Sequence, residues 1–146
     1  IVQEKKFQYP DIDFVLRHEN LDAHTEVFCE LVDLERMISN LTNNAIESYG
    51  GNHGKVILQM NTIKTNTLRA DSSLNRGLEI QIKDSGRGIS RSLQRIFGKH
   101  VLKSEKADGA GIGVYFASKK IKEWGGKFTF ESQEGQGTTI NILLRS

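Results

Sequence analysis

The sequence has few of the features that mark secreted, membrane-spanning or nucleic-acid-binding proteins. Its one cysteine, Cys29, has no partner for a disulfide within the chain, and a buried thiol in a reducing compartment is its expected state. No apolar run reaches the roughly 20 residues that cross a bilayer, and no signal peptide opens the chain. The formal net charge of +2 gives no sign of a dedicated nucleic-acid binder. We therefore expect a cytoplasmic domain that neither inserts into a membrane nor binds nucleic acid.

The length and composition fit one globular domain. With 146 residues, of which 37% are hydrophobic and 26% charged, the chain can bury a core of ordinary size. We expect residues 1–146 to form a single domain. The abrupt start at Ile1 suggests a piece of a longer protein, whose remainder could carry a membrane anchor.

The strongest helical pattern runs from Leu31 to Tyr49, with its apolar positions in one stripe and Asp33 available as the N-cap. Asn40, Asn44 and Glu47 fall on a second stripe beside the first. Asparagines four residues apart put two neutral carbonyl oxygens in register, which suits a hard cation already balanced by phosphate charge. A solvated helix face explains the same residues equally well.

Alternation of apolar and polar residues predicts several strands, some of them half-buried. These strands are predicted at residues 6–19, 26–29, 55–60, 78–83, 127–131 and 138–144. Two further helices are predicted, a short one at residues 90–97 and a longer one at residues 114–124. Residues 61–77 are polar and lack a period, so we expect them to form an extended hairpin connection.

Asp84 follows a predicted strand in which apolar residues occupy every second position from Leu78 to Ile82. The same phase puts Asp84 on the apolar side, where a carboxylate needs hydrogen-bond donors because an unpaired buried charge is costly. Gly86 and Gly88 come next and would let a ligand approach the backbone, and a base with an exocyclic amino group would supply a donor. A turn-forming aspartate that bonds its own backbone explains the same residues.

A cluster of glycines, Gly109, Gly111 and Gly113, precedes the predicted helix at residues 114–124. Such a cluster leaves backbone N–H groups uncovered, and the helix directs the positive end of its dipole toward them. This arrangement suits a phosphate chain, although plain helix-entry loops share it. The preceding residues 100–108 are polar and contain lysines, as either a lid over phosphates or a solvated loop would.

Four blocks, in this order, resemble the N, G1, G2 and G3 boxes of the histidine-kinase-type ATPase domain. The blocks are Asn40-Leu41-Thr42-Asn43-Asn44-Ala45, Asp84-Ser85-Gly86-Arg87-Gly88-Ile89, Gly109-Ala110-Gly111-Ile112-Gly113 and Gly135-Gln136-Gly137-Thr138-Thr139. Ile96-Phe97 resembles a remnant of the family's phenylalanine box. The likeness covers residues 10–144, and four boxes in order are far more specific than one.

The resemblance implies the Bergerat fold, an α+β two-layer sandwich in which helices cover one face of a mixed, mainly antiparallel sheet. ATP would lie between the helix layer and a lid. By this resemblance Asp84 would accept a hydrogen bond from the adenine amino group, and Thr138 would help to close the adenine end. Gly86 and Gly88 would let the base come close, and Ile89 would belong to the same binding segment.

The resemblance also assigns the phosphate end of the site. Asn44, together with Asn40, would hold Mg²⁺ against the phosphates, so both are expected metal ligands and catalytic residues. Lys103 is the expected catalytic lysine, with Lys99 and Lys106 as the alternatives for the contact with the γ-phosphate. The other nucleotide-binding residues that we expect are Lys99, Lys106, Gly109, Gly111, Ile112 and Gly113.

Two features depart from the family's pattern. Many histidine kinases carry a basic residue three positions after the Mg²⁺-binding asparagine and often an aromatic residue next, but here these positions hold Glu47 and Ser48. A lysine of the 99–106 segment would then have to supply the phosphate contact. The phenylalanine box continues as Gly98-Lys99-His100 in place of further aromatic or proline residues, which predicts a different lid behaviour.

The reaction expected from the resemblance is phosphoryl transfer to a protein. Hydrolytic members of the wider superfamily place a glutamate at the position of Asn40, and an amide cannot act as a general base. In histidine kinases the acceptor is a histidine on a separate dimerisation domain, so we expect as partners that domain of the same parent kinase and a downstream response regulator. A serine kinase of the anti-sigma-factor type and a non-catalytic nucleotide-sensing module are the alternatives.

Overall fold

The computed structural model describes residues 1–64, 76–99 and 110–145. Its elements, in chain order, are α1 (Val2–Gln8), β1 (Ile12–Arg17), α2 (Leu31–Glu47), β2 (Gly54–Lys64), β3 (Arg76–Asp84), α3 (Arg91–Gln94), α4 (Ala110–Glu123), β4 (Lys127–Gln133) and β5 (Gly137–Arg145).

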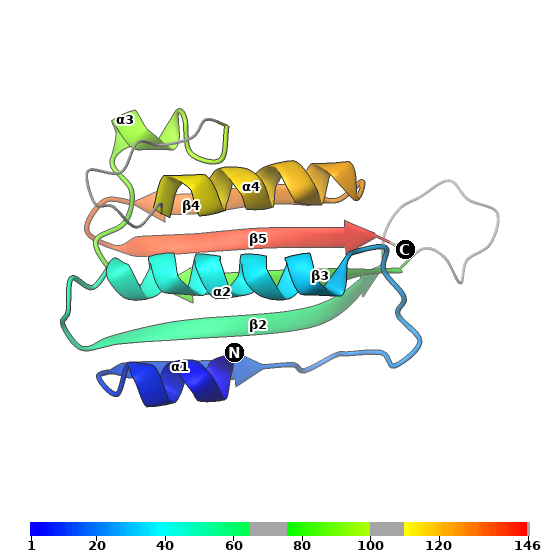
Figure 1. The fold of residues 1–146 in the computed structure, drawn as a ribbon, viewed down its shortest axis with the longest axis horizontal. Helices are drawn as coiled ribbons and strands as arrows, with labels where there is room; N and C mark the ends of the chain where they lie inside the picture. The colour runs from blue at the N-terminus through cyan, green and yellow to red at the C-terminus, as the bar shows by residue number, and fades with distance from the viewer. Residues whose placement is uncertain (65–75, 100–109, 146) are drawn as a thin grey trace.

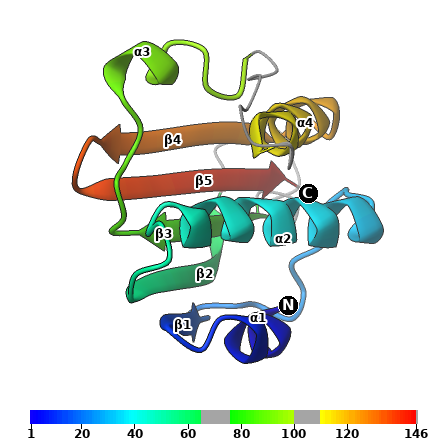
Figure 2. The same ribbon diagram turned by 60° about the vertical axis from the view of Figure 1, so that its left-hand side comes forward.

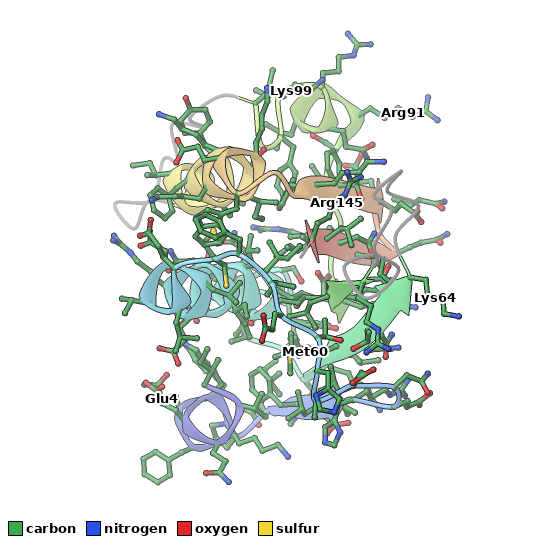
Figure 3. The ribbon with its side chains drawn as sticks, turned by 90° about the vertical axis from the view of Figure 1, so that its right-hand side faces the viewer. Glu4, Met60, Lys64, Arg91, Lys99 and Arg145 are labelled. Carbon is green, nitrogen blue, oxygen red and sulfur yellow. The ribbon has the colours of Figure 1, made fainter. Side chains whose placement is uncertain are left out.

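The strands form one mixed sheet in the order β1-β2-β3-β5-β4 (Figure 1). β1 and β2 are parallel, and every other neighbouring pair is antiparallel. The central strand β3 lies between β2 and β5, with Ile82 opposite both Leu58 and Ile140. Helices α1, α2 and α4 lie on one face of this sheet (Figures 2 and 3). The expected α+β two-layer sandwich is therefore confirmed.

The core lies between the sheet and the two long helices, as the alternation within the strands and the helical stripe predict. α2 packs over β2 and β3, and α4 packs over β4 and β5. The buried apolar side chains of these helices are Leu34, Met37, Ile38, Leu41, Ala45, Ile46, Val114, Ala117 and Ile121. α4 ends at Glu123, and Gly125, two residues further on, has a φ of +70°, the left-handed conformation that terminates many helices.

The predicted N-cap of α2 is wrong. Glu30 occupies the N-cap position without a side-chain hydrogen bond, and Asp33 lies inside the first turn. There the Asp33 carboxylate pairs with the Lys120 ammonium of α4 at 3.0 Å, and the hydrogen bond from Lys120 lowers the pKa of Asp33. Asp33 thus joins two helices, because its position in the first turn directs it sideways toward α4.

Three predicted segment boundaries also differ from the structure. Residues 2–8 are helical, so only residues 12–17 of the predicted first strand pair with the sheet. Residues 26–29 are not a strand: Phe28 N–H reaches Arg145 O at 3.4 Å, but no ladder follows this bond. The expected connection at residues 61–77 is shorter, since the β2–β3 ladder continues to the Lys64–Arg76 pair. No helix among the described residues is both long and apolar enough to cross a membrane.

Leu41→Ala is expected to lower the free energy of unfolding by about 2–5 kcal/mol, because Leu41 is fully enclosed between α2 and the sheet and its truncation leaves a cavity. Leu31→Ala is the matched control on the same helix: Leu31 is 67% exposed, so a change within about 0.5 kcal/mol is expected. Urea unfolding of both variants measures the difference. Equal losses would contradict the core described above.

Candidate functional site

Asp84, the last residue of β3, is buried against the end of α2, with 6% of its surface exposed. Its carboxylate oxygen Oδ1 accepts a hydrogen bond from the Gly86 N–H at 2.9 Å and lies 3.0 Å from the Ser48 hydroxyl. The backbone of Thr138 supplies a further donor to the carboxylate. The inward direction predicted from the strand phase is confirmed.

Burial raises the pKa of Asp84, and the hydrogen bonds from Gly86, Ser48 and Thr138 oppose this rise. The bond from Gly86 is the local turn bond that the sequence left open as an alternative. Asp84 therefore forms a turn and is also buried, and the two interpretations do not exclude each other.

The loop after Asp84 packs against Ser48 on one side and against Gln133 on the other, and Gly86 and Gly88 leave room for these contacts. A Cβ on Gly86 would lie 1.9 Å from Ser48 Oγ, so the space beside Gly86 is filled by α2's last turn. Gly88 has a φ of +66°, and a Cβ there would lie 2.1 Å from the carbonyl oxygen of Gln133. The N–H of Arg87 donates to Ser48 O at 3.1 Å. In this structure these glycines serve close packing of the protein, and their approach to a ligand stays a prediction.

The asparagines of α2 belong to a polar stripe that is longer than the sequence suggested. Asn40, Asn44 and Ser48 are spaced four residues apart and so follow one another along one side of the helix, over about 12 Å. A Cβ on Gly113 of α4 would lie 3.4 Å from Asn40 Cβ, whereas Ser48 contacts Asp84. The stripe therefore runs from the first turns of α4 to the loop after β3.

Within the described residues, the amide side chains of Asn40 and Asn44 form no hydrogen bond, although both are half-buried. Asn43, in contrast, accepts a hydrogen bond from the buried Lys5 ammonium at 2.6 Å. No cluster of three or more histidine, cysteine or acidic residues occurs among the residues described, so a metal at this site would rely on amide oxygens and on a bound ligand. Glu47 is exposed.

The glycine cluster differs from its predicted form. α4 begins at Ala110, so Gly111, Ile112 and Gly113 lie inside the helix and not in a loop before Val114. This first part of α4 lies beside α2, where a Cβ at Gly113 would be in ordinary contact with Asn40 at 3.4 Å, so tertiary packing accompanies the helix despite the low helix propensity of glycine. Gly109, Lys103 and Lys106 lie outside the described residues.

Thr138 is buried at the start of β5, where its hydroxyl lies 3.0 Å from the Ser132 hydroxyl of β4. Ser132 Oγ also accepts a hydrogen bond from the N–H of Ile89 at 2.9 Å. The amide of Gln94 donates to Ile89 O at 2.7 Å. Ile89 and Thr138 are thus brought together through Ser132.

Lys99 is exposed and lies beside α3, apart from α2 (Figure 3). Phe97 anchors this segment, with its ring 4.6 Å from that of Phe130. The structure therefore brings Asp84 and Thr138 close to the α2 stripe, and it places Lys99 elsewhere on the surface.

Sequence reasoning missed two residues that organise the site. In the sequence Ser48 stands out only because it replaces an aromatic residue, although its spacing from Asn44 places it on the same stripe. Ser132 follows Phe128 and Phe130 in phase, so extending the alternation of the strand by one step would have placed it on the helix-covered face.

Comparison with known proteins gives a family match. The family model described as histidine kinase-, DNA gyrase B- and HSP90-like ATPase matches residues 29–146. The sensor histidine kinase ZraS of Escherichia coli is 29% identical over 130 residues, which are 88% of this chain and 25% of ZraS. The alginate biosynthesis sensor protein KinB of Pseudomonas aeruginosa is 33% identical over 114 residues, 77% of this chain and 17% of KinB. The chain thus spans a quarter or less of these two relatives.

Solved structures confirm the fold. The catalytic domain of histidine kinase ThkA superposes with a TM-score of 0.73 at 24% identity, covering 98% of this chain and 84% of that one. ThkA has also been solved in complex with the response regulator protein TrrA, at a TM-score of 0.67 and 22% identity, covering 98% of this chain and 36% of that one.

Gly88→Ala is expected to destabilise the domain more than Gly135→Ala. Both glycines have positive φ, +66° and +79°, so each substitution costs about 1–2 kcal/mol in backbone strain. Only at Gly88 does the new Cβ also collide with backbone, at Gln133 O, which must move. Urea unfolding compares the two variants. Equal losses would show that the loop does not pack on the β4–β5 turn as described.

Proposed function

The chain belongs to the histidine kinase-, DNA gyrase B- and HSP90-like ATPase family, and we propose that it is the ATP-binding catalytic domain of a sensor histidine kinase. In this proposal it binds ATP with Mg²⁺ and transfers the γ-phosphoryl group to a histidine on a separate dimerisation domain. The observation that carries the proposal is the buried Asp84 carboxylate at one end of the Asn40–Asn44–Ser48 stripe.

Asp84 is suited to recognise the base. A carboxylate offers about four lone-pair sites, and the protein supplies donors from Gly86, Ser48 and Thr138. About one acceptor site is left for the exocyclic amino group of adenine. Because the carboxylate is buried, an additional donor from the ligand would stabilise its ionised form.

The other end of the stripe is suited to phosphates. Mg²⁺ prefers oxygen ligands and usually keeps several waters, so Asn40 and Asn44 would supply only part of its shell and the phosphates another part. These two half-buried amides fit that role because neither is hydrogen-bonded within the described residues. The first turn of α4, close to Asn40 through Gly113, would present backbone N–H groups to the phosphate chain. The roles of Lys99, Lys103, Lys106 and Gly109 stay predictions.

The proposed reaction depends on positioning and charge neutralisation. A nitrogen of the acceptor imidazole forms a bond to the γ-phosphorus, and the bond to the bridging oxygen breaks, with ADP as the leaving group. The imidazole itself is the nucleophile, so this domain need not supply a base. Asn40 supports transfer over hydrolysis, because a neutral amide cannot activate water by taking its proton.

The relatives support the choice of partners. ZraS and KinB are named as sensor proteins, and ThkA is a histidine kinase solved with a response regulator. For this chain we propose a phosphoacceptor dimerisation domain of the same parent kinase, a downstream response regulator and a cytoplasmic location. One observation favours a non-catalytic nucleotide-sensing module as the second candidate: the exposed Glu47 adds negative charge to the helix that would face the phosphates.

Asp84→Asn is expected to abolish ATP binding measured by isothermal titration calorimetry with Mg²⁺ present. The NH₂ group of the asparagine can face the exocyclic amino group of the base, so that two hydrogen-bond donors would meet. The substitution also removes the buried negative charge. Asp13→Asn, at an exposed position on the edge strand β1, is the matched control and should keep the wild-type affinity. Wild-type affinity in Asp84→Asn would overturn the adenine assignment.

Phosphoryl transfer is expected to give an acid-labile product. The domain is incubated with γ-labelled ATP and candidate dimerisation domains, and the labelled protein is then exposed to acid and to alkali. Phosphohistidine is lost in acid, so label that survives acid would favour the serine kinase. ATP binding without label on any acceptor would favour the nucleotide-sensing module.

A further inference from the structure

Ser48 joins the end of α2 to the carboxylate of Asp84. Its Oγ lies 3.0 Å from Asp84 Oδ1 and 2.7 Å from the carbonyl oxygen of Ala45. The hydroxyl has one proton for these two acceptors. When Asp84 is ionised, the proton is attracted to the carboxylate, because hydrogen bonds to charged groups are stronger than those to neutral ones.

The surroundings of Ser48 keep this contact in place. The carbonyl oxygen of Ser48 accepts the N–H of Arg87 at 3.1 Å, and the Tyr49 hydroxyl accepts the N–H of Ser85 at 2.8 Å. Tyr49 in turn donates to Lys55 O at 2.6 Å. Ser48 and Tyr49, the two residues that follow α2, therefore fix the backbone on either side of Gly86, and Ser48 also holds the carboxylate.

Gly86 and Ser48 depend on each other. The hydroxyl of Ser48 occupies the volume that a Cβ at position 86 would need. A larger residue at position 48, such as an aromatic one, could not occupy the same place without moving the loop. The pair lets a small hydroxyl reach the carboxylate from the side of α2.

We propose that Ser48 is a positioning residue for base recognition, whose hydroxyl orients the Asp84 carboxylate toward the exocyclic amino group of the nucleotide base. This inference rests on the proposed ATP-binding function. Ser48 itself does not touch the base in this proposal; it acts through Asp84. Its contribution should therefore depend on whether the ligand carries the amino group that Asp84 recognises.

The test compares two ligands and two proteins by calorimetry in the presence of Mg²⁺. The ligands are ATP and purine riboside triphosphate, in which hydrogen replaces the 6-amino group. We expect the wild type to prefer ATP by about tenfold or more, the scale of one hydrogen bond to a charged group. We expect Ser48→Ala to lose most of this preference while binding the analogue as the wild type does. Ser92→Ala, which removes an exposed serine hydroxyl on α3, should keep the preference.

Each outcome separates this inference from the function on which it rests. If Ser48→Ala weakens both ligands equally, or neither, the hydroxyl has only a structural role and the inference is wrong, whereas loss of ATP binding in Asp84→Asn would still support the function. If the wild type binds ATP and the analogue equally, the roles of Asp84 and Ser48 are both wrong. If the wild type binds no ATP, the proposed function and this inference fail together. Should Ser48→Ala not fold, Ser48→Cys takes its place, because a thiol is a weaker donor of similar shape.

A pH profile gives a second readout. Ionised Asp84 is the form that accepts from the base, so ATP binding is present above the pKa of Asp84 and is lost as the pH falls through it. The Ser48 hydrogen bond lowers this pKa against the effect of burial. Removing the hydroxyl raises the pKa, and the acid loss of ATP affinity should move to higher pH in Ser48→Ala. An unchanged profile would contradict the contact.

Discussion

A carboxylate buried at the end of a central strand has to receive hydrogen bonds from several directions, and this requirement shapes the structure around Asp84. β3 has a partner strand on each side, so its end is enclosed by β2, β5 and the helix above. Donors reach Asp84 from the following loop through Gly86, from α2 through Ser48 and from β5 through Thr138. Three segments distant in sequence thus meet at one side chain, and the proposed site forms where they meet.

Glycine makes these approaches possible, and its use differs from one position to the next. Gly86 leaves room for a serine hydroxyl and Gly88 takes a left-handed conformation against the β4–β5 turn, whereas at Gly113 a Cβ would make only an ordinary contact with Asn40. The glycines of the G1 box thus have an architectural explanation within this chain. That explanation does not compete with ligand binding, because a loop held rigidly by its own packing presents its remaining backbone groups in a fixed geometry.

The sequence predicts the parts of the fold and site that depend on strong local periodicity. The phase of β3 placed Asp84 inward, and the α2 stripe placed Asn40 and Asn44 together, because strand and helix geometry determine these directions. Prediction from the sequence fails where tertiary contacts determine the role of a residue. Asp33 has the side chain of an N-cap, but the Lys120 ammonium lies close enough to pair with it.

Local sequence patterns also fail to report the tertiary contacts of whole segments and of single side chains. Residues 26–29 alternate like a strand but meet β5 through one hydrogen bond at its last residues, too few for a ladder. The contact between Ser48 and Asp84 crosses 36 residues of chain, which no local pattern reports.

The composition of α2 determines how charge is balanced in the proposed site. Toward the phosphate end the helix offers two neutral amides, and its only basic residue, Arg36, lies over the Phe116 ring of α4, 5.6 Å from its centroid. Glu47, near the other end, adds a negative charge. In the proposed function, a triphosphate beside this helix would be attracted through Mg²⁺, through backbone N–H groups and through cations from other segments, and not through a fixed cation on α2. In the proposed function, the base end supplies selectivity through a buried acid, and the phosphate end depends on the metal.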